Sequence, residues 1–152
     1  MDPAHNHWPM NPVTWRRRGA SKAGEPVRRC DLEPDVDAPR RARGIVAEFC
    51  ATYGIGAESE VVELITSELV TNAVRHAGTQ ITLTLRLSGP LLRVAVRDGA
   101  GGDVQPVQLT DETAESGRGL SLVDALAERW GSVFLHSGKT VWATVRVRRP
   151  VG

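Results

Sequence analysis

The stretch ELITSELVTNAVRHAG, residues 63–78, predicts a helix that is buried on one side. Its apolar residues recur at the spacing of one helix face, and they are Leu64, Ile65, Leu69, Val70, Ala73 and Val74. Glu68, Asn72 and His76 stand four residues apart, so they stack along one side of the helix, beside this apolar stripe. A polar group there must find a partner or face a cavity. The row therefore either lines a functional site or has its polar groups hydrogen-bonded locally. In the second case, His76 would be favoured as a cation near the helix C-terminus.

Patterns on both sides of this stretch predict the remaining elements. Before it come a strand at 27–32 and a helix from Asp37, whose apolar side consists of Val36, Ile45, Val46, Phe49 and Cys50. The stretch itself belongs to a long helix at 57–77, which Gly78 closes. After it come strands at 79–88 and 91–98, a loop at 99–116, a helix at 117–131, and strands at 132–138 and 139–148 that turn at Ser137 and Gly138. Gly54 and Gly56 end the first helix. Because strands and helices do not alternate strictly, a parallel sheet is disfavoured. The order predicts an α+β two-layer sandwich, with a mixed, mostly antiparallel sheet and helices on one face.

Composition sets the class of protein. The chain has 152 residues and a hydrophobic fraction of 41%, which suits one soluble domain. No apolar run approaches the roughly 20 residues of a membrane span, and no signal sequence is evident, so a cytoplasmic location is expected. Cys30 and Cys50 are too isolated for a disulfide framework or a cysteine metal site. Residues 1–26 predict a disordered basic tail, with a nucleic-acid arm as the alternative, and residues 27–149 form the domain.

Two further segments carry residues suited to chemistry. Asp98 ends a strand and is followed by GAGG, so its carboxylate suits recognition of an amino group. Gly117 and Gly119 begin a helix, where backbone N–H groups approach an anion and the helix N-terminus favours negative charge. Thr140 lies in the final strand, where its hydroxyl either supports the ligand of Asp98 or is simply a good strand former.

Four motifs in order, ELVTNAVRHA, VRDGAGG, GRGL and GKTVWATV, resemble the N box, the two glycine boxes and the closing strand of the GHKL ATPase superfamily. That superfamily includes gyrase B subunits, heat-shock chaperones and histidine kinases. The resemblance is closest to the stand-alone anti-sigma-factor serine/threonine kinases and their actinobacterial relatives, and it covers residues 27–148. It implies the Bergerat ATP-binding fold.

The resemblance also implies roles for individual residues. Asn72 would hold the Mg²⁺ that bridges the triphosphate of ATP, and Glu68 would act as the general base. Asp98 would accept a hydrogen bond from the adenine amino group. The other residues implied in nucleotide binding are Gly102, Gly117, Arg118, Gly119, Leu120 and Thr140. Arg75 and Arg118 could reach phosphates or be surface charges.

The glycine box at residues 98–102 departs from the family pattern. It reads DGAGG, so Ala100 stands where a glycine is common, and the expected lid at residues 103–116 is short and offers few basic residues. One added methyl group either narrows the adenine pocket or is harmless.

The function implied by the resemblance is that of an anti-sigma-factor kinase. It would use ATP and Mg²⁺ to phosphorylate a serine on a STAS-type anti-sigma-factor antagonist, and it would sequester a sigma factor. Relatives often dimerise, so a homodimer is a further expectation. A non-catalytic nucleotide-binding module that sequesters a partner is the alternative. A detached histidine-kinase domain is disfavoured because the chain has no long helical hairpin, and a DNA-binding regulator built on the arginines at 16–18 is the weakest candidate.

Overall fold

A single antiparallel sheet forms one layer of the structure. The computed structural model describes residues 24–99, 117–135 and 138–148. Its strands, in spatial order, are β1 (Val27–Leu32), β2 (Ile81–Ser88), β3 (Leu91–Asp98), β5 (Gly138–Arg146) and β4 (Arg129–Leu135). Every neighbouring pair of these strands is antiparallel. The sequence predicted a mixed, mostly antiparallel sheet, and the described strands contain no parallel pair.

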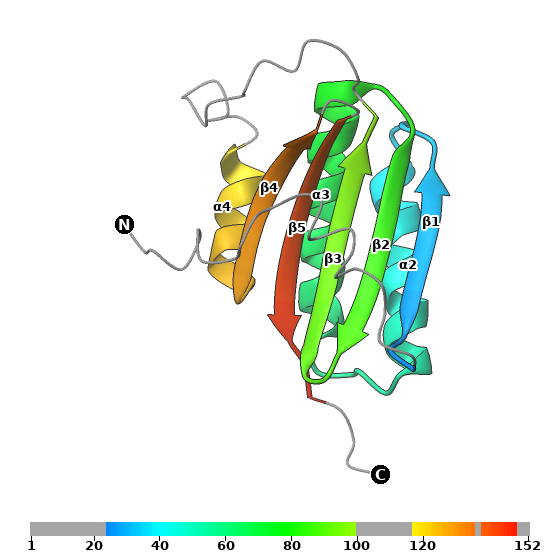
Figure 1. Ribbon diagram of the computed structural model, residues 1–152, viewed down its shortest axis with the longest axis vertical. Coiled ribbons are helices and arrows are strands. Elements are labelled where there is room, and N and C mark those ends of the chain that lie inside the picture. The colour runs from blue at the N-terminus through cyan, green and yellow to red at the C-terminus, as the bar shows by residue number, and fades with distance from the viewer. Residues whose placement is uncertain (1–23, 100–116, 136–137, 149–152) are drawn as a thin grey trace.

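In the part of the chain that the structure describes, three helices form the second layer, on one face of this sheet (Figure 1). They are α2 (Ala38–Thr52), α3 (Ser59–Ala77) and α4 (Gly117–Leu126). The predicted α+β sandwich is confirmed. No helix in the described part of the chain combines the length and the apolar character needed to cross a membrane.

The ends of α2 differ in detail from the prediction. Asp37 occupies the N-cap position, but its side chain makes no capping hydrogen bond. Asp35 caps the turn instead, because its Oδ1 accepts from the backbone N–H of Asp37 at 2.9 Å. Val36 was expected on the apolar side, yet it is 90% exposed, because it precedes the first helical turn. The helix ends at Thr52, just before Gly54, whose φ is +71°.

The helix α3 is the central element of the helical layer. It closes at Gly78, which adopts the left-handed conformation with φ +59°, as predicted. Ile65, Leu69 and Val70 are completely buried or nearly so, whereas Leu64 is 40% exposed and does not belong to the stripe. The reason is geometric, since consecutive residues are about 100° apart around a helix and Ile65 already faces the sheet.

The helix α4 is shorter than predicted. It ends at Leu126, and residues 129–131, which the sequence had placed in this helix, belong to β4. The backbone leaves the helix where Glu128 donates from its N–H to the carbonyl of Thr144 in β5 at 2.8 Å. Trp130 then donates from Nε1 to Oδ1 of Asp124 at 2.8 Å, which links β4 to α4. Sheet pairing therefore overrides helical periodicity here. Ser137 of the predicted turn lies outside the described residues.

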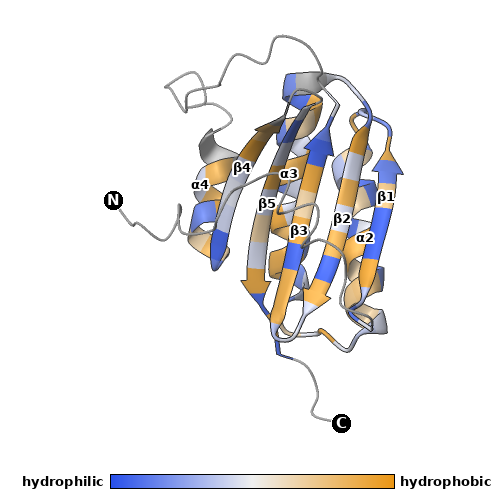
Figure 2. Ribbon diagram, in the orientation of Figure 1, coloured by the Kyte–Doolittle hydropathy of each residue, from blue (hydrophilic) through white to orange (hydrophobic). Residues whose placement is uncertain are grey.

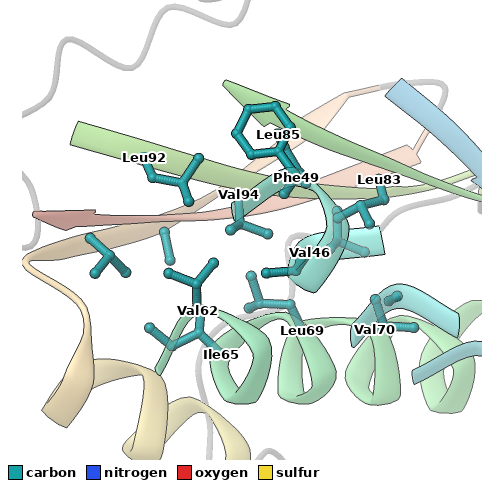
Figure 3. Close-up of a cluster of buried hydrophobic side chains, with 14 of the residues drawn as sticks. Val46, Phe49, Val62, Ile65, Leu69, Val70, Leu83, Leu85, Leu92 and Val94 are labelled. Carbon is teal, nitrogen blue, oxygen red and sulfur yellow. The ribbon is translucent and has the colours of Figure 1, made fainter. Parts of the chain in front are cut away.

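The core lies between the two layers. Figure 3 shows side chains of α2 and α3 meeting those of the strands, and the labelled ones are Val46, Phe49, Val62, Ile65, Leu69, Val70, Leu83, Leu85, Leu92 and Val94. The strands contribute alternate residues, because successive side chains point to opposite faces, and Figure 2 shows the resulting hydrophobic and hydrophilic bands along β3. On β3 the inward set is Leu92, Val94 and Val96. Asp98 continues this set, so its side chain lies on the helix-covered face.

Candidate functional site

The elements that carry the predicted site residues within the described ranges meet at one end of the sandwich. Figure 1 shows that β3 ends there, β5 begins there, the C-terminal part of α3 reaches it, and α4 starts beside it. These segments come from four distant parts of the sequence. The antiparallel order of the strands and the length of α3 bring them together.

Asn72 is a buried polar residue with an unsatisfied oxygen. The residue is 7% exposed, and among the described residues its Oδ1 has no hydrogen-bond partner. The other buried polar side chains of α3 are satisfied: Thr66 donates to the carbonyl of Val62 at 2.7 Å, and Ser67 accepts from Arg43 at 2.9 Å. A buried acceptor without a donor costs about 1–3 kcal/mol. This cost is expected where a ligand satisfies the oxygen.

Glu68 lies one helical turn before Asn72 and is half-buried. The two residues share one flank of α3, because a four-residue step turns about 40° beyond a full turn. This helix contacts both α4 and β3. The structure thus keeps the predicted row together, with a carboxylate and an amide oxygen on the same flank.

Asp98 is almost completely buried at the end of β3, with 2% of its surface exposed. Its Oδ1 accepts from the backbone N–H of Lys139 at 3.3 Å. The next residue, Gly99, donates from its N–H to Oγ1 of Thr79 at 3.0 Å. The carboxylate is therefore held by the start of β5, and the backbone that follows it is held by the segment that precedes β2.

Gly138 allows β5 to pass close to this carboxylate. A Cβ atom at Gly138 would lie 2.0 Å from the carbonyl oxygen of Asp98, and the φ of Gly138 is +139°. Both facts restrict the position to glycine. The sequence had suggested only a turn here, and the close approach to Asp98 could not be foreseen without the strand pairing.

Thr140 does not lie beside Asp98, which corrects the expectation that its hydroxyl supports the same ligand. In the register of β3 with β5, Asp98 is opposite Lys139, whereas Thr140 is opposite Arg97. Side chains of neighbouring residues in a strand point to opposite faces, so Thr140 lies on the face away from the helices. Lys139 occupies the position next to Asp98, and sequence reasoning had assigned it no role.

Two ionisable side chains at this end, Lys139 and His76, have lowered pKa values. Burial lowers the pKa of Lys139, and Asp98 partly opposes that shift. The pKa of His76 is also lowered, first by partial burial of its ring and then by Lys139 and Arg75, while Asp98 acts in the opposite direction. Of the three, Asp98 and Lys139 lie directly opposite each other on neighbouring strands, and His76 keeps an exposed surface.

The remaining predicted residues lie on or before α4. Gly117 and Gly119 are at the N-terminus of α4, where free backbone N–H groups favour an anion. Leu120 is partly buried and packs against the core. The side chain of Arg118, together with Gly102, Ala100 and the loop at 103–116, falls outside what the structure describes.

The site suits a cation that is shared with a ligand. In the described ranges no group of three or more His, Cys, Asp or Glu side chains could hold a metal ion. Mg²⁺ needs only one or two protein oxygens when phosphates and water complete its shell. The unsatisfied Oδ1 of Asn72 fits that requirement. Cys30, which is partly buried, and Cys50, which is buried, are both free thiols.

Comparisons with known proteins bear on the family and the fold of the chain. Residues 32–145 match the family model of the histidine kinase-like ATPase domain. The crystal structure of the RsbU and RsbW domains of Rv1364c from Mycobacterium tuberculosis is similar, with 24% identity and a TM-score of 0.63 over 83% of this chain. The chain spans 34% of the length of that protein, and at this identity the likeness is one of fold. A search of curated proteins gave no match. The family model covers most of the chain, so the chain belongs to the histidine kinase-like ATPase domain family.

Proposed function

We propose that the chain binds ATP with Mg²⁺ at this end of the sandwich and transfers the γ-phosphoryl group to a serine of a protein partner. The observation that carries the proposal is the buried Oδ1 of Asn72, which has no hydrogen-bond partner among the described residues. It lies one turn from Glu68 on a helix that reaches the same end as Asp98.

Different residues would bind different parts of the nucleotide. Asp98 would accept from the amino group of adenine, because its carboxylate is buried and held against β5. The N-terminus of α4 would bind phosphate oxygens. Asn72 would hold the Mg²⁺, and this ion, when bound, neutralises charge on the phosphates.

Glu68 would orient or deprotonate the serine hydroxyl that attacks the γ-phosphorus. A base in this role must lie within hydrogen-bond reach of the hydroxyl or act through one water. Because Glu68 precedes Asn72 by one turn, its carboxylate would stand on the same flank of α3 as the oxygen that would hold Mg²⁺. Transfer of this kind depends mainly on positioning and charge neutralisation, so a small domain can perform it.

The partners that we propose are a STAS-type anti-sigma-factor antagonist as phosphate acceptor and a sigma factor that the chain sequesters. The support is the resemblance of the four sequence motifs to anti-sigma-factor kinases, together with membership of the ATPase domain family. A phosphoserine adds up to two negative charges to an interface, so phosphorylation would change which partner is bound.

Replacing Asn72 by Leu tests the proposal. Leucine has a similar branched shape but no oxygen for Mg²⁺, so we expect the Mg²⁺-dependent affinity for ATP to fall at least about tenfold. Removing an unsatisfied buried oxygen should also raise the free energy of unfolding by about 1 kcal/mol. Calorimetric titration with Mg²⁺ or with EDTA measures the first effect, and chemical denaturation measures the second.

Ser67→Ala serves as the matched control, because Ser67 is buried on the same helix but is already bonded to Arg43. It should lose some stability and keep its affinity for Mg²⁺ and ATP. If Asn72→Leu bound Mg²⁺ and ATP like the wild type, the assignment of the metal ligand would be wrong.

A further inference from the structure

Lys139 and Asp98 form a cross-strand pair at the proposed base-binding end. They are opposite each other in the register of β3 with β5, so both side chains lie on the helix-covered face. Directly opposed residues of antiparallel strands have Cβ atoms about 4.5–5.5 Å apart. Gly138 presses the start of β5 against the backbone of Asp98, which fixes this spacing. A hydrogen-bond acceptor and a cationic donor thus stand side by side.

Lys139 carries donors that the described residues do not use. The residue is partly buried, and none of the hydrogen bonds or ion pairs within the described ranges involves its ammonium group. An ammonium has three N–H donors and no acceptor. Burial lowers its pKa, and Asp98 partly restores the charged form. A ligand atom that accepts a hydrogen bond would compensate for the lost hydration of this group.

We propose that Lys139 is a second base-recognising residue, which donates a hydrogen bond to N1 of adenine while Asp98 accepts from the neighbouring amino group. This inference rests on the proposed function. Adenine presents an amino donor beside a ring-nitrogen acceptor, and the Asp98–Lys139 pair presents the complementary acceptor and donor. On guanine the corresponding positions carry an acceptor oxygen and an N–H donor, in reversed order. The pair therefore contributes to the choice of adenine.

The experiment changes one atom of the ligand and one side chain of the protein. ATP and 1-deaza-ATP, in which C–H replaces N1, are titrated into the wild type and into Lys139→Met. We expect the wild type to bind 1-deaza-ATP at least about tenfold more weakly, because a hydrogen bond from a charged donor is lost. Lys139→Met should bind both nucleotides equally. Arg146→Met, an equal change of charge at the exposed end of β5, should discriminate like the wild type.

A second measurement, made without nucleotide, tests whether Lys139 lies close enough to His76 to influence its pKa. Lys139 helps to lower the pKa of His76, so removing its charge should raise the His76 midpoint in an NMR titration, whereas Arg146→Met should leave it unchanged. An unchanged His76 midpoint in Lys139→Met would contradict the placement.

Each binding outcome decides the inference. Equal binding of ATP and 1-deaza-ATP by the wild type would show that N1 is not recognised. Undiminished discrimination by Lys139→Met would show that another group recognises it. Either result overturns the role of Lys139 and leaves ATP binding intact. Failure of the wild type to bind ATP at all would instead overturn the proposed function, and the inference with it.

Discussion

Replacing Glu68 by Gln is expected to slow phosphoryl transfer at least about 100-fold while the affinity for ATP changes little. Glutamine keeps the size of the side chain but cannot accept a proton, and general base catalysis typically contributes about 10²–10⁴-fold. Asn72 remains in place one turn away, so Mg²⁺ and ATP should still bind. The measurement is transfer of labelled γ-phosphate from ATP to a STAS-type antagonist, beside a calorimetric titration of ATP.

Glu60→Gln is the matched control for this prediction. Glu60 is exposed in the first turn of α3, two turns before Glu68, and carries the same charge. It should transfer phosphate at the wild-type rate. Normal transfer by Glu68→Gln would remove Glu68 as the base. If the wild type bound Mg²⁺ and ATP but transferred nothing to any antagonist, the chain would be the non-catalytic sequestering module instead.

Gly138→Ala is expected to destabilise the fold and to abolish nucleotide binding together. The new Cβ atom would lie 2.0 Å from the carbonyl oxygen of Asp98, and the φ of +139° is one that alanine rarely adopts. Strain of this kind costs on the order of 2–4 kcal/mol. In a chain of this size that lowers the Tm by roughly 5–15 °C. Since the clash is with Asp98 itself, the surviving folded protein should bind ATP poorly.

Gly44→Ala is expected to change the Tm in the opposite direction, so it is the control for replacing a glycine by alanine. Gly44 is exposed within α2, and a Cβ atom there would meet nothing within 4 Å. Alanine in a helix interior is favoured over glycine by about 1 kcal/mol, so the Tm should rise. Thermal unfolding of both variants decides the matter: a Gly138→Ala protein as stable as Gly44→Ala would contradict the close approach of β5 to Asp98.

The layered fold could be predicted because its signals are periodic. The alternation of β2 and β3 and the helical spacing of α3 each continue over eight or more residues. The errors lie at ends, where periodicity has few residues to act on. Val36 lies before the first turn of α2, and residues 129–131 pair with β5 although their spacing also fits a helix.

The relative placement of the candidate residues could be predicted where they share one helix. It could not be predicted where it depends on the pairing of two strands. Glu68 and Asn72 share a flank of α3 because their spacing dictates it. Asp98 was predicted as a site residue from its place at the end of a strand, and the structure buries it there. Lys139 and Thr140 are adjacent in sequence, however, and only the register of β3 with β5 shows which of them faces Asp98. The alternation of β5, with Val141 and Ala143 in the core, was the signal that favoured Lys139.

The most direct test of a nucleotide site at this end is a calorimetric titration of ATP, with and without Mg²⁺, into the wild type and Asp98→Asn. Our account predicts Mg²⁺-dependent binding by the wild type and a loss of at least about tenfold in Asp98→Asn. The single amide oxygen of asparagine would accept from the backbone N–H of Lys139, so its NH₂ group would face the adenine amino group, donor against donor. No binding by the wild type at millimolar ATP, or equal binding by both proteins, would contradict it.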